Sequence, residues 1–81
     1  MRIRVLLFAS AKDLLQADHL DLELPASATV GDLRRTLGDT ERRIAGLLPR
    51  SAIAVNEEFA DDATVLDTNS KVALLPPVSG G

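Results

Sequence analysis

The chain has 81 residues, with nine lysine and arginine and twelve aspartate and glutamate side chains, a net charge of −3, and a hydrophobic fraction of 46%. This length and composition indicate one globular domain, and the negative net charge argues against nucleic acid as a partner. With no cysteine and a single histidine, His19, neither a disulfide nor a metal site is expected, and the lack of a signal peptide or a long apolar run predicts a cytoplasmic protein without a membrane partner.

The first two predicted strands cover residues 1–8 and 18–24, where apolar and polar side chains alternate as they do in half-buried strands. We expect these two strands to pair. Phe8 breaks the alternation because it lies on the same face as the arginines of the first strand. Two interpretations stay open for Phe8: a strand end that is covered by the chain's own loops, or an apolar patch for a partner.

Helices are predicted between the strands. A short one over residues 9–16 is expected to turn Leu14 and Leu15 inward. A longer one begins at Thr29, whose side chain can cap it, and Gly38 is expected to close it. Its apolar stripe and that of a following shorter helix predict packing on one face of a sheet. The stripe residues are Val30, Leu33, Leu37, Ile44, Leu47 and Leu48. The arginines between these positions are interpreted as a solvated face.

The remaining strands are predicted over residues 52–55 and 71–75, with a short one at residues 65–66. The apolar continuity of the last strand indicates a central position in the sheet. This order of elements predicts an α+β fold of the β-grasp class, with a mixed sheet and helices packed on one face. The domain is expected to comprise residues 1–75, followed by an extended C-terminal tail over residues 76–81.

The tail directly follows the last strand and reads Pro76-Pro77-Val78-Ser79-Gly80-Gly81. Because neither proline has an N–H to donate, the chain must leave the sheet there. A glycine pair allows the backbone to enter a channel too narrow for a side chain, and six extended residues reach roughly 20 Å. We therefore interpret the free carboxylate of Gly81 as the working group, and residues 76–80 as the segment that gives it access.

Four motifs carry a family resemblance: residues 5–9 with Leu14-Leu15, the helix start Thr29-Val30-x-x-Leu33, the strand end Ala54-Val55-Asn56, and above all residues 72–81. In these motifs the chain resembles the small subunits of molybdopterin synthase, a family of ubiquitin-like sulfur carriers, over nearly its whole length. The family often has aromatic residues where this chain has Leu74 and Leu75. That departure affects packing detail more than role.

The resemblance implies a sulfur carrier without a catalytic site of its own, which serves as the small subunit of a sulfurtransferase. A ubiquitin-activating-like adenylyltransferase uses ATP to adenylate Gly81, and sulfur then displaces AMP to leave a C-terminal thiocarboxylate. The tail inserts into the large synthase subunit, in a heterotetramer of two small and two large subunits, and gives sulfur to the pterin precursor of the molybdenum cofactor. The resemblance implies no bound cofactor and no metal. It places Phe8, Phe59 and Leu75 at the partner interface.

Three alternatives stay open. The chain is a sulfur carrier of another pathway, such as thiamine synthesis or tRNA thiolation, although carriers for thiamine tend to lack the second helical segment seen here at residues 39–48. It is a protein modifier that is conjugated through Gly81 to lysines. It is a plain interaction module whose glycine tail is inert.

Overall fold

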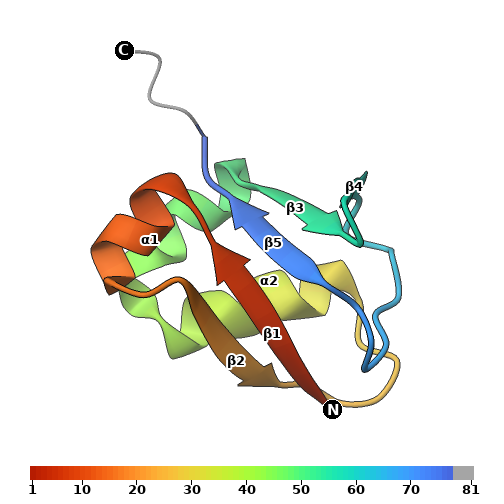
Figure 1. The fold of residues 1–81 in the computed structure, drawn as a ribbon. Helices are drawn as coiled ribbons and strands as arrows, with labels where there is room; N and C mark the ends of the chain where they lie inside the picture. The colour runs from red at the N-terminus through yellow and green to blue at the C-terminus, as the bar shows by residue number, and fades with distance from the viewer. Residues whose placement is uncertain (78–81) are drawn as a thin grey trace.

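The structure, a computed structural model, describes residues 1–77. Its elements are β1 (Arg2–Leu7), α1 (Ala9–Leu15), β2 (His19–Glu23), α2 (Val30–Thr40), the 3₁₀ helix η1 (Arg42–Arg50), β3 (Ala52–Val55), β4 (Glu58–Ala60) and β5 (Val72–Leu75). The strands form one sheet in the order β2-β1-β5-β3-β4, with β5 at its centre beside β1 (Figure 1). The central pair β1 and β5 is parallel, and every other neighbouring pair is antiparallel.

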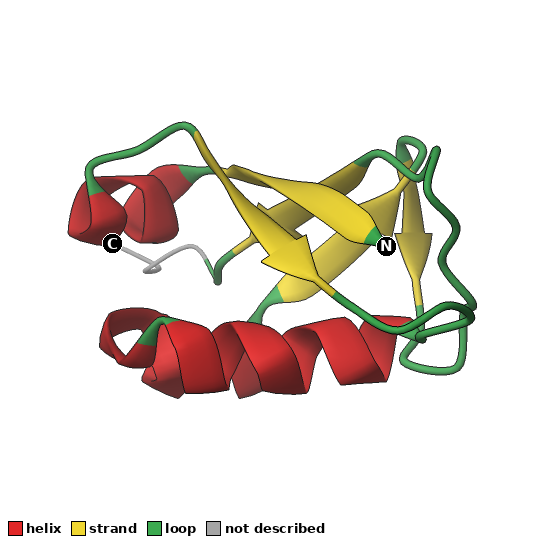
Figure 2. Cartoon of the chain, turned by 90° about the horizontal axis from the view of Figure 1, so that it is seen from below, coloured by secondary structure: helices red, strands yellow, loops and turns green. Residues whose placement is uncertain are grey.

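The helices leave one face of this sheet open. Helix α2 and η1 lie together on the other face, and α1 sits at one end of the sheet, where it contacts η1 (Figure 2). A mixed sheet with a helix laid across one face is the β-grasp architecture, so the fold class that the sequence predicts is confirmed.

A capping box explains where α2 begins. The Asp32 N–H donates to the Thr29 side chain over 3.1 Å, and the Thr29 N–H donates to the Asp32 carboxylate over 3.0 Å. That backbone hydrogen bond from Thr29 holds the pKa of Asp32 below its ordinary value. The Val30 N–H donates to the Thr64 carbonyl, so the loop before β5 is fastened to the start of the helix. The predicted helix start is confirmed.

The core lies between α2 and the covered face of the sheet. Leu33 and Leu37 are completely buried there, together with Ile3, Val5 and Val72 from the two central strands. This set is the one that the helical stripe and the strand alternation predict. Burial of apolar side chains of this size is the main stabilising contribution available to so small a domain.

We expect Leu33→Ala to lower the free energy of unfolding by about 2–5 kcal/mol, because it removes a fully buried side chain and leaves a cavity. Urea unfolding followed by circular dichroism measures the change. The matched control is Leu14→Ala, since Leu14 is 46% exposed, and its effect should stay within about 0.5 kcal/mol. Equal midpoints for Leu33→Ala and the wild-type chain would show that the core is assigned wrongly.

Two details of the helices differ from the expectations. Leu14 does not face inward, because the inner face of α1 is formed by Ala11 and Leu15, which are four residues apart. Gly38 does not end α2, which continues to Thr40. A Cβ at Gly38 would lie 3.1 Å from the nearest methyl group of Leu48, so this glycine gives η1 room to pack against α2.

The arginine-rich segment is not a uniformly solvated face. Arg34 is largely covered, and its guanidinium donates to the Leu48 and Ser51 carbonyls and to the Asp62 carboxylate. It therefore ties α2 to the end of η1, to the residue that precedes β3, and to the loop after β4. Pairing a partly buried guanidinium with several acceptors offsets the cost of removing it from water.

The short strand lies earlier than predicted. It is β4, which follows β3 through a two-residue hairpin turn at Asn56-Glu57, whereas Val65 forms only an isolated bridge with Thr29. Asn56 and Glu57 both have positive φ angles, 53° and 71°, as a type I′ turn requires. The sequence favours Asn56 for such angles, but nothing in it marks Glu57 as the second left-handed residue.

Glu57→Gly is expected to raise the free energy of unfolding by about 0.5–1 kcal/mol, because glycine adopts the left-handed conformation without the Cβ clash that Glu57 carries. Thermal unfolding checks this value. The control is Asn56→Gly, which should gain less because asparagine already tolerates that conformation. A lower stability for Glu57→Gly would contradict the turn assignment.

Candidate functional site

The predicted site residues of the tail lie at the limit of the described chain. β5 ends at Leu75, after which Pro76 is buried and Pro77 is half-buried. Val78, Ser79, Gly80 and Gly81 lie outside the described residues. The structure therefore shows where the last strand ends, and the roles of the tail residues stay predictions.

The open face of the sheet carries a row of side chains that crosses all five strands. Register pairs Leu6 with both His19 and Ala73, and pairs Ala54 with both Ala73 and Phe59. Four of these five residues are apolar. Phe59, at the outer end of the row, is 79% exposed. Large exposed side chains that share one sheet face are a common feature of protein interfaces.

Phe8 and Leu75 lie beside this row, at the end of the sheet where β5 finishes. Leu7 pairs with Leu74, and the backbone of Phe8 stays extended, so the next position of this register places Phe8 level with Leu75. Phe8 is 44% exposed and Leu75 is half-buried. The exposure of Phe8 favours the interpretation of a patch over that of a strand end covered by loops.

We call these open-face residues the apolar patch: Leu6, Phe8, Ala54, Phe59, Ala73 and Leu75, of which Ala54 is buried between its neighbours. The three predicted interface residues Phe8, Phe59 and Leu75 share this face. Phe8 directly follows β1, Leu75 ends β5, and Phe59 lies at the outer edge of the sheet. Leu6, Ala54 and Ala73 are not among the predicted site residues. The alternation of the first strand places Leu6 on that face, but Ala73 joins it only through the pairing of β1 with β5.

The other half of the open face is charged. Arg4 pairs with Asp21 over 3.1 Å and Arg2 with Glu23 over 3.2 Å, across the antiparallel pair β1 and β2. The hydrogen bond from Arg4 lowers the pKa of Asp21. Exposed pairs of this kind contribute little to stability. They do mark the limit of the apolar patch, because a partner that buried these two pairs would have to remove four charged groups from water.

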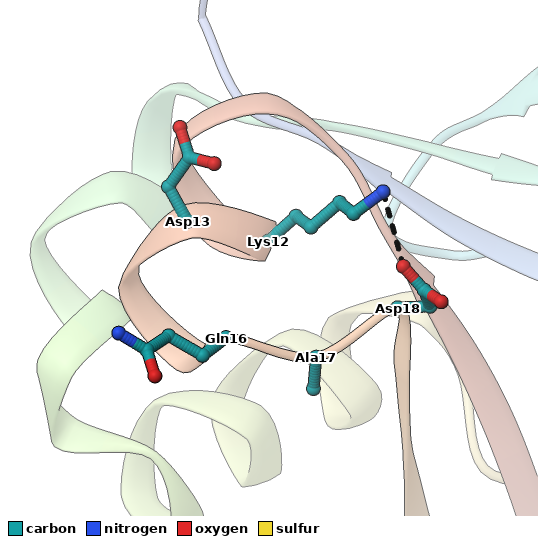
Figure 3. A pocket seen from close by; sticks show the side chains of 5 residues that line it. All are labelled: Lys12, Asp13, Gln16, Ala17 and Asp18. Carbon is teal, nitrogen blue, oxygen red and sulfur yellow. Dashed lines mark ion pairs between the residues drawn. The ribbon is translucent and has the colours of Figure 1, made fainter.

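A hollow of about 440 Å³ lies elsewhere, at the turn between α1 and β2 (Figure 3). It is lined by Lys12, Asp13, Gln16, Ala17 and Asp18, and its one ion pair joins the Lys12 amine to the Asp18 carboxylate over 3.0 Å. The Lys12 and Asp18 side chains are both exposed and pair with each other, as charges on a protein surface commonly do.

Residues 1–77 contain no candidate metal site and no membrane-spanning helix. No three histidine, cysteine, aspartate or glutamate side chains there are grouped so that they could hold a metal ion. None of the helices in this part of the chain is long and apolar enough to cross a bilayer.

The open face of this β-grasp domain carries an apolar patch beside the end of the last strand. A domain of this class is suited to docking on other proteins. The sequence model of the ThiS family matches residues 5–81. The molybdopterin synthase sulfur carrier subunit of Dictyostelium discoideum is 34% identical, in an alignment that covers 99% of this chain and 96% of that protein. The chain belongs to the ThiS family.

Solved structures show the same fold. The chain is similar to one chain in the complex of subunits 1 and 2 of molybdopterin-converting factor from Helicobacter pylori, with 26% identity, a TM-score of 0.71 and full coverage of both chains. It also resembles SAMP1 from Haloferax volcanii, with a TM-score of 0.86, 22% identity and full coverage of both chains. The second likeness concerns the fold alone.

Proposed function

We propose that this chain is the sulfur carrier and small subunit of a molybdopterin synthase. The observation that carries the proposal is its likeness, over the full length of both chains, to the Dictyostelium discoideum protein of that name. The similarity to a chain from a complex of subunits 1 and 2 of molybdopterin-converting factor supports a large subunit as the partner. The ThiS family match over residues 5–81 supports a carrier that includes the Gly-Gly end.

In this proposal the large subunit docks on the apolar patch. Phe8 and Leu75 lie together where β5 ends, so a partner held there also receives the tail. Exposed aromatic side chains that become buried are the usual anchors of an interface, each contributing about 2 kcal/mol or more. The proposed assembly contains two small and two large subunits.

The proposed chemistry takes place on the carboxylate of Gly81. A carboxylate is a poor electrophile, so an adenylyltransferase first lets it attack the α-phosphorus of ATP, which releases pyrophosphate and leaves an acyl adenylate. A sulfide equivalent then attacks the carbonyl carbon and AMP departs, which leaves a thiocarboxylate. In the large subunit the thiocarboxylate sulfur attacks a carbon of the pterin precursor and displaces an oxygen substituent, which gives a thioester. Hydrolysis breaks the acyl–sulfur bond, leaves the sulfur on the pterin and returns the carboxylate of Gly81, and a second carrier chain supplies the second sulfur of the dithiolene.

The proposal assigns no cofactor and no reaction centre to this chain, since its partners supply the active sites. Gly80 gives the backbone access to those sites because it has no side chain. We place the protein in the cytoplasm, where ATP is available for the activation step.

The test uses the chain with a C-terminal thiocarboxylate, the large subunit and the pterin precursor. We expect the dithiolene to form, and the chain to lose one sulfur for each sulfur that the pterin gains. The control is the same chain with an ordinary carboxylate, which should give no product. Transfer of sulfur to a thiazole precursor or to tRNA instead, or an isopeptide bond at Gly81, would contradict the proposal and favour one of the alternatives.

A further inference from the structure

The junction between β1 and α1 contains a backbone conformation that its residue type disfavours. Ala9 has a φ angle of 50°, in the left-handed region. A side chain with a Cβ is strained there, and glycine is the residue that ordinarily occupies such a position. Ala9 is exposed, so burial of its methyl group does not offset the strain.

The other left-handed residues differ in their setting. Gln16 ends α1, where this conformation is usual, and Asn56 with Glu57 forms the hairpin turn. Ser27 lies in the loop between β2 and α2. Ala9 alone among these five is the first residue of a helix, one residue after Phe8, an exposed member of the apolar patch.

Both sides of Ala9 are held in place. Before it, the Leu7 N–H donates to the Asp18 carbonyl over 2.8 Å, and Leu7 pairs with Leu74 in β5. After it, α1 is anchored by the buried Ala11 and by the ion pair between Lys12 and Asp18 (Figure 3). A strained conformation persists where its surroundings determine it in this way.

The conformation has a direct effect on Phe8. Because Ala9 makes the whole turn from strand to helix, Phe8 keeps the extended angles of a strand, with φ −132° and ψ 161°. Its side chain therefore stays on the open face with Leu6, beside Leu75. A turn that took two residues would take Phe8 out of its extended conformation and away from the apolar patch.

We propose that Ala9 is a positioning residue, whose left-handed backbone and Cβ together hold Phe8 in place for the partner that docks on the apolar patch. This inference rests on the proposed function, because it assumes that the large subunit of molybdopterin synthase is that partner. Glycine would make the same turn without strain but with much more backbone freedom, so Phe8 would lose its fixed position. Pre-organised side chains bind more tightly because less conformational entropy is lost on association.

The experiment measures stability and affinity for the purified large subunit in three variants of the full chain. Ala9→Gly should melt at the same temperature as wild type or higher, yet bind about fivefold more weakly. A change of this size corresponds to the free-energy cost of ordering one side chain on association. Ala9→Ser keeps a Cβ and should bind as wild type does. Ser27→Gly relieves the same backbone conformation away from the open face, and should leave affinity unchanged.

The result that would overturn the inference is an Ala9→Gly chain that binds as tightly as wild type while Phe8→Asp still abolishes binding. In that case the proposed function stands and only the role of Ala9 falls. A wild-type chain that does not bind the large subunit at all would contradict the proposed function itself, and the inference with it.

Discussion

Changing Phe8 and Phe59 together to aspartate is expected to abolish association with the large subunit of molybdopterin synthase and to leave the isolated domain folded. The two side chains are 44% and 79% exposed, so the domain loses little packing when they are replaced. Each is expected to contribute about 2 kcal/mol or more as a buried anchor in the complex. An aspartate in the same place also brings a charge that the complex must remove from water.

Calorimetric titration gives the affinity, and thermal unfolding of the isolated variant shows whether the fold is retained. A matched control is Val65→Asp, because Val65 is an apolar residue of 62% exposure on the loop before β5, outside the apolar patch. That variant should bind as wild type does. A double variant that still co-elutes with the large subunit would show that the apolar patch is not the interface.

Local patterns in the sequence account for most of the fold. The alternation of the first strands, the capping pair Thr29 and Asp32, and the stripe through Leu33 and Leu37 each depend on residues close together in the chain. They can therefore be predicted from the sequence without knowledge of the tertiary contacts. The central position of the last strand was also predictable, because its run of apolar residues is typical of a strand buried on both faces.

The features that sequence reasoning missed depend on contacts between distant residues. Gly38 looks like a helix end, and only the packing of Leu48 shows that it is a point of close approach between two helices. Its sequence context suggests that Arg34 is solvated, and only the structure shows that its guanidinium donates to the carbonyls of Leu48 and Ser51. Ala73 joins the apolar patch through strand register, which the residues of β5 do not reveal by themselves.

The candidate site likewise contains residues that the sequence identifies and one feature that it does not reveal. Phe8 could be identified from its broken alternation, and its exposure in the structure agrees with a role on the surface. The left-handed conformation of Ala9 has no sequence signal, because alanine is an ordinary helix residue. The predicted roles of Gly80 and Gly81 come from the sequence and the family resemblance, since these residues lie outside the described chain.

Deleting Gly81, or adding one residue after it, is expected to stop pterin conversion completely while the chain still folds and binds. Either change moves the terminal carboxylate by about 3 Å. That is a large error where reacting atoms must lie about 3–3.5 Å apart. Gly80→Val should have the same effect, because it adds a branched side chain to the segment that, in the proposed function, enters a narrow channel of the partners.

Conversion of the pterin precursor by the reconstituted synthase measures this loss. Gly46→Ala is a suitable control, because a Cβ at Gly46 meets no atom within 4 Å, and it should retain full conversion. Thermal unfolding of each tail variant should match that of the wild-type chain. Normal conversion by the Gly80→Val chain would show that access along the tail does not depend on glycine.

The most direct test of the central claim is the intact mass of the chain after incubation with the adenylyltransferase, ATP and a sulfur source. The wild-type chain should gain the mass that corresponds to replacement of one oxygen by sulfur, and fragmentation should locate the change at Gly81. A chain that lacks Gly81 should gain nothing. A chain without Gly81 that still acquires sulfur and supports pterin conversion would contradict the account of this protein as a carrier that works through its terminal carboxylate.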